Sequence, residues 1–445
     1  MKRRNLQVIL MLATISSSCA LGQVSCLKGS TAETKLVCQF PFATGVFANA
    51  SALGGSTGTN DAQRVAAGLN TAIATQLSQL PIASASSGQV VTYKAGLAKS
   101  FEDLGPILTD RAQTLGPNTF YLGVTASQFV FTDVDGKSLG SLPFSYFRNA
   151  YVNGVLQSTI YTTEKTNLHL KANQLVGVAT FGIGKRFDAS AIVPVVYISI
   201  GDTTYSTMNY VVDAATNTLS FQYASKDSSV PGTASGIGDI TFNAKYSPWS
   251  SEHAAVALAA NLRTPTGDEL NLLGSGAFGF NPYVVYSYVS EHFSPHAKVG
   301  YQWNTATELN IGTPAQTSTT STTSSTSPSS KKSLPGGMTY DVGADFTIHK
   351  KLTIAIDLLG NQYLNTPGLQ STQTSVAGVP GGSLNTISIV NSSYTINNVS
   401  TGFKWRPSRD LGLVLSANVL IQLNNVGLRS RPTPLVGISY RWGKD

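Results

Sequence analysis

From residue 118 onward, apolar and polar residues alternate with a period of two, in segments of about 10–15 residues. One segment places Ile240 and Phe242 on one face, with Thr241 and Asn243 on the other. Alternation of this kind predicts β-strands that have one face in an apolar medium and the other in a polar one. We therefore expect an all-β fold over this part of the chain.

The connections between these strands distinguish a membrane barrel from a soluble sandwich, whose strands alternate in the same way. Short links such as 290–292 and 349–351 interleave with long links such as 132–166 and 306–336. Short turns on the periplasmic side and long loops on the outer side are typical of outer-membrane barrels. The sequence thus predicts an antiparallel transmembrane β-barrel preceded by a partly helical N-terminal region.

The pattern predicts about twelve strands, and an even number places both chain ends on the periplasmic side, as export requires. The predicted strands lie near residues 118–131, 167–182, 186–200, 236–247, 254–264, 276–289, 293–305, 337–348, 352–360, 393–406, 411–424 and 432–442. Two further fragments, 205–212 and 219–223, are either a hairpin inside a loop or two more strands, which would make about fourteen.

Residues 1–22 have the features of a cleavable export signal. Lys2, Arg3 and Arg4 form its positive start, and residues 6–15 form an apolar stretch that is too short to span a bilayer. Small residues near its end predict cleavage after Gly22. No later stretch of about 20 apolar residues follows, so we expect no membrane-spanning helix, and any span must be a closed barrel.

Residues 23–116 form a predicted N-terminal region, which lies either in the periplasm or as a plug inside the barrel. Apolar residues recur at every fourth position from Val65 to Leu77, which predicts one helix near 61–80. Cys26 and Cys38 are a candidate disulfide in an exported chain, with two free thiols as the alternative.

The barrel is expected to occupy residues 117–442, and the Ser- and Thr-rich stretch 313–336 within it is expected to be a solvated extracellular loop. Only 12% of residues are charged and 41 are glycine, which suits an uncharged β-structure better than a cytosolic enzyme. The net charge of +7 falls to about +4 without the basic residues of the leader, and no long basic run remains. We therefore expect no nucleic-acid partner.

Aromatic residues gather near the ends of the predicted strands. They are Phe187, Tyr246, Trp249, Phe293, Trp303, Trp405, Tyr440 and Trp442. Such positions predict the aromatic girdles that mark the two membrane–water boundaries of a barrel.

Charged residues lie on the non-lipid faces of the strands. A Lys or Arg facing lipid at the midplane would cost about 2–4 kcal/mol, so we expect them to face the lumen or to lie near the rims. The candidate lumen-lining residues are Arg186, Asp188, Asp239, Lys245, Arg263, His296, Lys298, Asp341, Asp345, Asp357 and Lys404. Either they pair with one another and fill the barrel, or they form a polar lining that sets permeability. A barrel of about twelve strands lies between filled and open ones, so we expect a plugged or narrow lumen.

Several sequence blocks resemble those of a known family. They are 104–116, 235–239, 244–246, 262–268, 272–276, 295–296 and 300–304, with weaker support from 357–360 and 434–438. From about Gly88 to Trp442 the chain resembles the outer-membrane barrels grouped under the meta-pathway of phenol degradation, which are similar in role to long-chain fatty-acid channels. The resemblance implies a barrel that admits apolar or aromatic small molecules, and it identifies no site residues.

The leading functional hypothesis is a channel for uptake of hydrophobic or aromatic small molecules by passive diffusion. Its vestibule would include the loop residues Phe144, Tyr146 and Phe147. Phe278 and Phe280 are further candidates, although a lipid-facing position suits them better. The partners expected are outer-membrane lipid, the export and barrel-assembly machinery, and a hydrophobic small-molecule ligand.

Two other classes stay open. One is a structural or adhesive barrel without transport. The other is an outer-membrane hydrolase, for which His296 with Ser294 is the candidate pair. A single histidine on a strand is more often structural than catalytic, so we expect no catalytic, cofactor or metal site.

Overall fold

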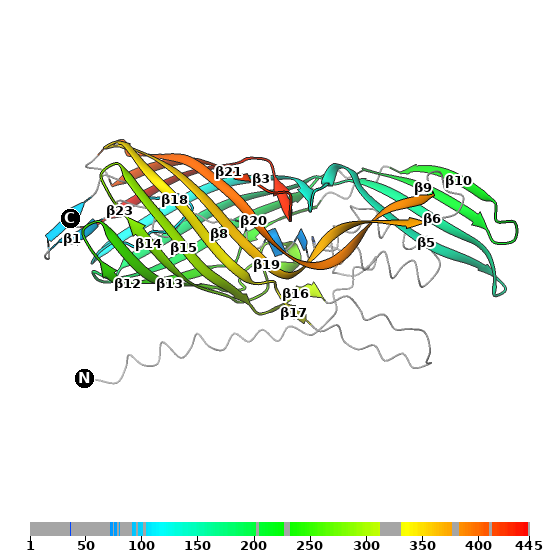
Figure 1. Cartoon of the computed structure of the whole chain (residues 1–445), viewed down its shortest axis with the longest axis horizontal. Helices are drawn as coiled ribbons and strands as arrows, with labels where there is room; N and C mark the ends of the chain where they lie inside the picture. Colours follow the sequence, from blue (N-terminus) through cyan, green and yellow to red (C-terminus); the bar gives the residue numbers. More distant parts are fainter. Residues whose placement is uncertain are drawn as a thin grey trace, which may run out of the picture.

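The computed structural model describes the barrel, its long hairpins and parts of the N-terminal region (Figure 1). The described residues are 36, 72–73, 75–77, 80, 91–94, 97–100, 104–201, 204–226, 232–311, 331–375, 382–408 and 412–443. Within the described part, no helical segment is both long and apolar enough to cross a membrane.

Twelve antiparallel strands form a closed ring, in which the last strand pairs with the first. In order around the ring they are β3 (Thr119–Val134), β7 (Leu170–Gly182), β8 (Phe187–Ile200), β12 (Thr241–Ser250), β13 (Ala254–Arg263), β14 (Gly279–Tyr288), β15 (Phe293–Asn304), β18 (Gly337–His349), β19 (Leu352–Ser375), β20 (Ser383–Trp405), β21 (Leu413–Gln422) and β23 (Thr433–Trp442). The predicted all-β barrel and its strand number are confirmed.

The alternative of fourteen strands is wrong. The fragments that raised it are β9 (Thr204–Asp213) and β10 (Leu219–Lys226), which form a hairpin outside the ring. β9 pairs with β6 (Val155–Asn167), and β6 pairs with β5 (Leu142–Val152), so the four strands form a separate sheet in the order β10, β9, β6, β5.

The four-stranded sheet projects beyond one end of the barrel, which we call the loop end (Figure 1). The long hairpin of β19 and β20 extends in the same direction, and β20 contacts β5. The C-terminus and the short turns lie at the opposite end, which we call the turn end. In barrels of this type the turn end faces the periplasm and the loop end faces outward.

Smaller elements complete the description. Two short hairpins pair β1 (Val91–Lys94) with β2 (Leu97–Ser100) and β16 (Ala306–Ile311) with β17 (Lys331–Ser333). The remaining short elements are β4 (Lys137–Ser138), β11 (Gly232–Ile237), β22 (Leu428–Ser430), η3 (Leu139–Ser141) and η4 (Glu269–Asn271).

The two faces of the wall differ as the alternation predicts. Apolar residues such as Phe242, Val342 and Val436 are exposed on the outer face, where a water-soluble protein would bury them. The aromatic residues of the predicted girdles are also exposed, with Trp249 at 51% and Trp303 at 52%, except for Tyr440, which is half-buried. A closed barrel with an apolar outer band and exposed aromatic rims is a membrane-spanning barrel of the outer-membrane type.

Candidate functional site

Residues 104–116 run through the barrel interior, in its turn-end half. Every residue of this stretch is buried. Its hydrogen bonds to the wall go to eight strands, which are β8, β12, β14, β15, β18, β19, β20 and β23. The backbone is extended and irregular, so it satisfies few of its own polar groups and relies on the wall for them. We call this stretch the inner segment.

A buried ion pair anchors the centre of the inner segment. The Arg111 guanidinium lies 2.5 Å from the Asp345 carboxylate on β18, and both side chains are at most 2% exposed. Next to it, the hydroxyl of Tyr283 on β14 donates to Asp110 at 2.6 Å. Charge-assisted bonds of this length are strong in a site that excludes water.

His296 on β15 connects the inner segment to two carboxylates. Its Nε2 lies 2.7 Å from the Thr109 hydroxyl and 2.9 Å from Asp357, and its Nδ1 lies 3.5 Å from Asp345. The Ser294 considered with it as a hydrolase pair has no hydrogen bond to this histidine in the described contacts. The histidine therefore holds the inner segment in place.

Other wall residues bind the main chain of the inner segment rather than its side chains. Lys404 on β20 donates to the carbonyl oxygens of residues 104 and 106, at 3.2 and 2.6 Å. Lys245 on β12 donates to the carbonyl oxygen of residue 111 at 3.1 Å. Asp188 on β8 accepts from the backbone N–H of Leu115 at 3.0 Å. These charged groups hold an irregular stretch of chain that no strand pairs with.

Along β8 the inner lining changes character between the two ends of the barrel. The buried inward positions run from Asp188 and Ser190 at the turn end to Val196, Ile198 and Ile200 at the loop end. Phe129 and Phe131 on β3 continue this apolar lining and stack with ring centroids 6.1 Å apart. The interior is therefore charged where the inner segment lies and apolar toward the outside.

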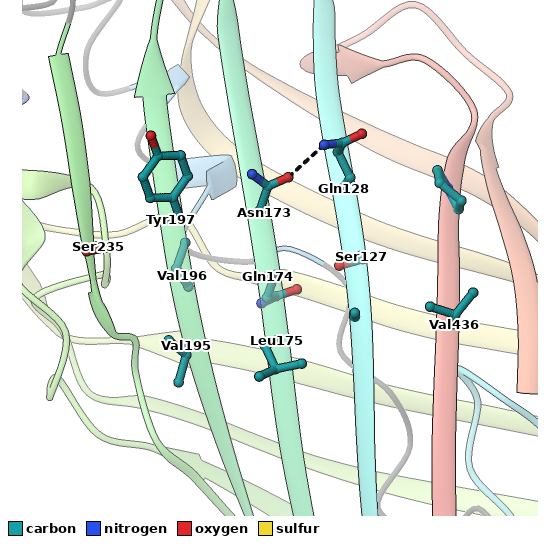
Figure 2. A pocket seen from close by; sticks show the side chains of 12 residues that line it. Ser127, Gln128, Asn173, Gln174, Leu175, Val195, Val196, Tyr197, Ser235 and Val436 are labelled. Atoms are coloured by element: carbon teal, nitrogen blue, oxygen red, sulfur yellow. Dashed lines mark hydrogen bonds between the residues drawn. The ribbon is translucent and has the colours of Figure 1, made fainter. Parts of the chain in front are cut away.

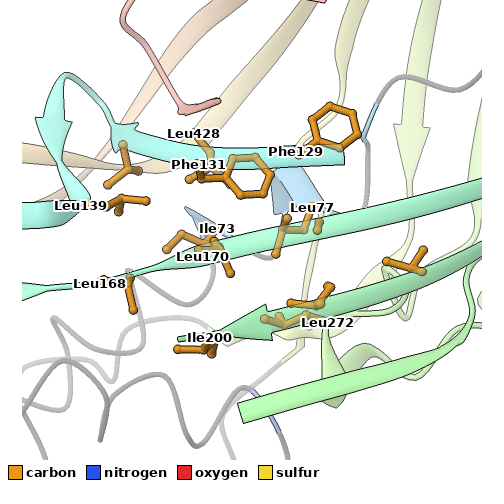
Figure 3. Packing of buried hydrophobic residues seen from close by; sticks show 14 of the residues in the cluster. Ile73, Leu77, Phe129, Phe131, Leu139, Leu168, Leu170, Ile200, Leu272 and Leu428 are labelled. Carbon is orange, nitrogen blue, oxygen red and sulfur yellow. The ribbon is translucent and has the colours of Figure 1, made fainter. Parts of the chain in front are cut away.

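Part of the N-terminal region occupies this apolar half (Figure 3). Ile73 and Leu77 of the predicted helical stripe are helical and fully buried against the wall, in one cluster with Leu170 and Leu428. Gln76 between them donates to the hydroxyl of Tyr394 at 3.0 Å. Leu36, which the helix prediction did not include, is also helical and belongs to the same cluster.

The loop after β13 folds inward and covers the apolar half. Asp239 accepts hydrogen bonds from the backbone N–H of Gly267 at 3.1 Å and of Ser275 at 2.7 Å. This fixes the loop so that Leu272 and Leu273 join the apolar cluster. Three of the sequence blocks that carry the family resemblance, 235–239, 262–268 and 272–276, thus meet at the Asp239 carboxylate. Their separation in the sequence did not reveal this contact.

The remaining lumen candidates pair with one another. Lys298 lies 2.5 Å from Asp341, and the Arg263 Nε lies 3.6 Å from Asp239. Arg186 is placed differently from the prediction, because it precedes the first residue of β8 and is exposed at the turn-end rim.

The lipid-facing position that we favoured for two of the vestibule candidates is confirmed. Phe278 and Phe280 are 52% and 47% exposed, and Phe280 stacks on the lipid-facing Trp303 with ring centroids 6.3 Å apart. Both therefore lie on the outer face. Several other predicted features lie outside the described residues, namely the leader, Cys26, Cys38, most of 313–336 and the side chains of Phe144, Tyr146 and Phe147.

Sequence reasoning missed the wall residues that bind the inner segment through uncharged groups. They include Tyr283, Ser287 and Thr353. Their inward position follows from alternation, but nothing in the pattern says which polar inward residue meets the N-terminal chain. In the described part of the chain, no cluster of His, Cys, Asp and Glu has the makings of a metal site.

The wall of β23, β3, β7 and β8 also has a depression with a volume of about 540 Å³ (Figure 2). Near its loop-end side, Gln128 donates to Asn173 at 3.0 Å on the outer face. Tyr197 beside them is 43% exposed. Apolar Leu175, Val195 and Val436 line the depression together with these polar residues.

Among solved structures, the chain is similar to an outer membrane channel from Pseudomonas putida F1, with 13% identity and a TM-score of 0.45, over 75% of this chain and 99% of that one. It is also similar to the P. putida toluene transporter TodX, with 8% identity and a TM-score of 0.30, over 74% and 91% of the two chains. A FadL homologue of Pseudomonas aeruginosa has 9% identity and a TM-score of 0.28, over 73% and 90%. Similarity this low leaves the function to be argued from the residues of this chain.

No curated protein matches the chain. Residues 156–425 match the model of the family described as "Putative MetA-pathway of phenol degradation". The match covers more than half of the chain, within the range over which its sequence blocks suggested the resemblance. The chain therefore belongs to this family.

Proposed function

We propose that the protein is an outer-membrane channel through which hydrophobic or aromatic small molecules enter by passive diffusion. The observation that carries the proposal is the change in the inner lining, from apolar at the loop end to charged at the turn end. Val196, Ile198 and Phe131 are buried in one cluster with the N-terminal and loop residues that cover them. A solute that enters where this cover opens would meet an apolar lining, which favours an apolar solute over a sugar. The family to which the chain belongs is named for the degradation of an aromatic compound, which agrees with such a solute.

The inner segment is the natural gate of such a channel. It crosses the lumen as an irregular chain, and non-covalent polar contacts hold it in place. A hydrogen bond between neutral groups contributes about 1 kcal/mol net and one to a charged group about 1.5–3 kcal/mol, because water replaces the partner when the contact breaks. Displacement of the segment therefore needs no unfolding of the barrel. Outer-membrane lipid would cover the apolar face, after export with removal of residues 1–22 and insertion by the barrel-assembly machinery.

The test is uptake by intact cells whose lipopolysaccharide layer limits the entry of apolar compounds. Initial rates of labelled toluene uptake would be compared between cells without the protein and cells in which heat-modifiability gels show the folded barrel. Swelling of liposomes containing the refolded mature chain would measure entry of arabinose. We expect faster toluene uptake, proportional to concentration and insensitive to an uncoupler, with little swelling in arabinose.

A structural or adhesive role is the second candidate, because the sheet of β5, β6, β9 and β10 projects beyond the barrel. Toluene uptake equal to that of cells without the protein, together with no swelling, would favour this role. Fast, size-limited arabinose entry would instead indicate a general porin and would contradict the proposed selectivity.

A further inference from the structure

One stretch of the inner wall is lined by small residues. Thr125 on β3, Gly437 on β23 and Ser416 on β21 lie side by side, since Gly437 pairs directly with each of the other two. Ser127 and Ser439 lie next to them on the same face. All five are only half-buried although they face the interior, so open space lies in front of them. We call these five residues the small-residue patch.

Two hydroxyls converge at the centre of this patch. A Cβ atom added at Gly437 would lie 2.7 Å from the Ser416 Oγ and 3.0 Å from the Thr125 Oγ1. The glycine therefore leaves a niche between two hydroxyl groups. In the described part of the chain, neither hydroxyl takes part in a hydrogen bond.

A buried carboxamide lies at each side of the patch. Asn418 on β21 is 4% exposed and Gln174 on β7 is 7% exposed, and both face inward. The register connects them through two residues, since Gln174 pairs with Ser127, Ser127 with Leu435, and Leu435 with Asn418. Figure 2 shows Gln174 and Ser127 on their neighbouring strands.

Each carboxamide has an oxygen without a partner. Asn418 donates through its Nδ2 to the Ser400 hydroxyl at 2.7 Å, but its Oδ1 has no hydrogen bond, and neither has the Oε1 of Gln174, among the described residues. A buried polar atom left unpaired costs about 1–3 kcal/mol. Two such atoms beside one patch indicate a place where a polar group of another molecule fits.

The inner segment makes few hydrogen bonds to this side of the lumen among the described residues, although its Leu115 shares a buried cluster with Tyr121 on β3 and Val176 on β7. Its described hydrogen bonds go to β8, β12, β14, β15 and β18 to β20, and β23 contributes only a 3.4 Å contact from Arg441 near the turn end. The small-residue patch lies on β3, β21 and β23, farther toward the loop end. A passage beside the inner segment would therefore run along the patch.

We propose that Asn418, Gln174 and the small-residue patch form a specificity site, which selects solutes with a hydroxyl group among the apolar molecules admitted. This inference rests on the proposed channel function. The hydroxyl of a phenol-type solute donates to a carboxamide oxygen and accepts from Ser416 or Thr125, while its ring stays against the small residues. Sites with buried polar groups discriminate strongly against an analogue that lacks the partner group, because those polar groups then remain unpaired.

Phenol and toluene test this site, because they have the same number of heavy atoms and differ in one hydroxyl. Uptake of both by intact cells would be measured for the wild type, Asn418→Leu, Gln174→Met and the double variant, after subtraction of uptake by cells without the protein. We expect each single change to lower the phenol-to-toluene ratio about three- to tenfold while toluene uptake is kept. The ratio does not depend on the amount of protein.

Asn281→Leu is the matched control, because Asn281 is also a buried inward carboxamide but lies on β14 and donates to Thr339 at 3.2 Å. Its ratio should equal that of the wild type. If a carboxamide variant does not reach the membrane, Thr125→Val replaces it, since that change exchanges one patch hydroxyl for a methyl group.

The failures of the two proposals are distinguishable. A wild type that admits neither solute overturns the channel function itself. The specificity site alone is overturned if the wild type admits both phenol and toluene and the variants that remove polar patch groups have the same phenol-to-toluene ratio as the wild type. An equal fall in the ratio for Asn281→Leu would also overturn it, because the effect would then not belong to the patch.

Discussion

Removal of the Arg111 guanidinium should release the inner segment. In Arg111→Met the Asp345 carboxylate stays buried without its main partner, and such a change costs about 3–5 kcal/mol. His296 remains 3.5 Å from Asp345 and keeps part of the compensation, so we expect the lower end of this range. Since 1.4 kcal/mol is a factor of ten, the released fraction should rise by about 10²-fold.

Cysteine labelling measures this release. Ala112 is fully buried in the inner segment, and Ala112→Cys in a chain with Cys26 and Cys38 replaced by serine reports its exposure. The rate of reaction with a membrane-impermeant maleimide would be compared in the presence and absence of Arg111→Met. A rate that rises far above that of the parent shows release, while barrel integrity is checked on heat-modifiability gels.

A double variant is the control for charge rather than size. Arg111→Met with Asp345→Leu removes both ions, and replacing a buried ion pair by apolar residues is often neutral or stabilising. We expect its labelling rate to return close to that of the parent. The reasoning would be refuted if the single variant labelled at the parent rate, or if the double variant labelled as fast as the single one.

Three further predictions concern the wall and its contacts. Leu415→Arg faces lipid and should cost about 2–4 kcal/mol, so refolding into lipid vesicles should fail far more often than for the neighbouring, inward Ser416→Arg; equal yields would contradict the register. Gly267→Ala places a Cβ 2.7 Å from a neighbouring glycine and should destabilise the inward loop by about 1–3 kcal/mol. The folded gel band should then disappear at a lower temperature. Gly184→Ala, which has open space around it, should leave that temperature unchanged. Lys404→Met leaves two carbonyl oxygens of the inner segment without their donor and should raise cysteine labelling at position 112 about tenfold; an unchanged rate would mean that Lys404 does not hold the segment.

Most of the barrel could be predicted from the sequence, for a physical reason. Strand residues alternate between two media, so the period of two predicts which face of each strand meets lipid. The interleaved short and long links predict the order of strands around the ring and the end at which each loop lies. The hairpin of β9 and β10 was ambiguous, because its residues alternate in the same way although it pairs with β6 outside the ring.

The contents of the lumen could be predicted only in part. Alternation places His296 and Asp345 on an inner face, but it does not say that Arg111 of the inner segment pairs with Asp345 there. The contact joins residues that are 234 positions apart, and no strand ladder connects the inner segment to the wall. The position of the inner segment inside the closed ring depends on loop-closure geometry and on side-chain size. A periodic pattern of apolar and polar residues contains information on neither.

The charges of the lumen pair within the wall, and several of them also bind the inner segment. Lys404 binds a backbone carbonyl of this segment, and Asp188 binds one of its backbone N–H groups. In the paired strands, the corresponding backbone groups bond to neighbouring strands instead. A ring of about twelve strands is too wide for its own side chains to fill its interior. Without the inner segment, such charges would therefore face water. A wall that binds main chain holds an extended segment without fixing most of its side chains. The segment can therefore leave and return while the ladder of the barrel stays intact, which is the property that a gate in a rigid ring requires.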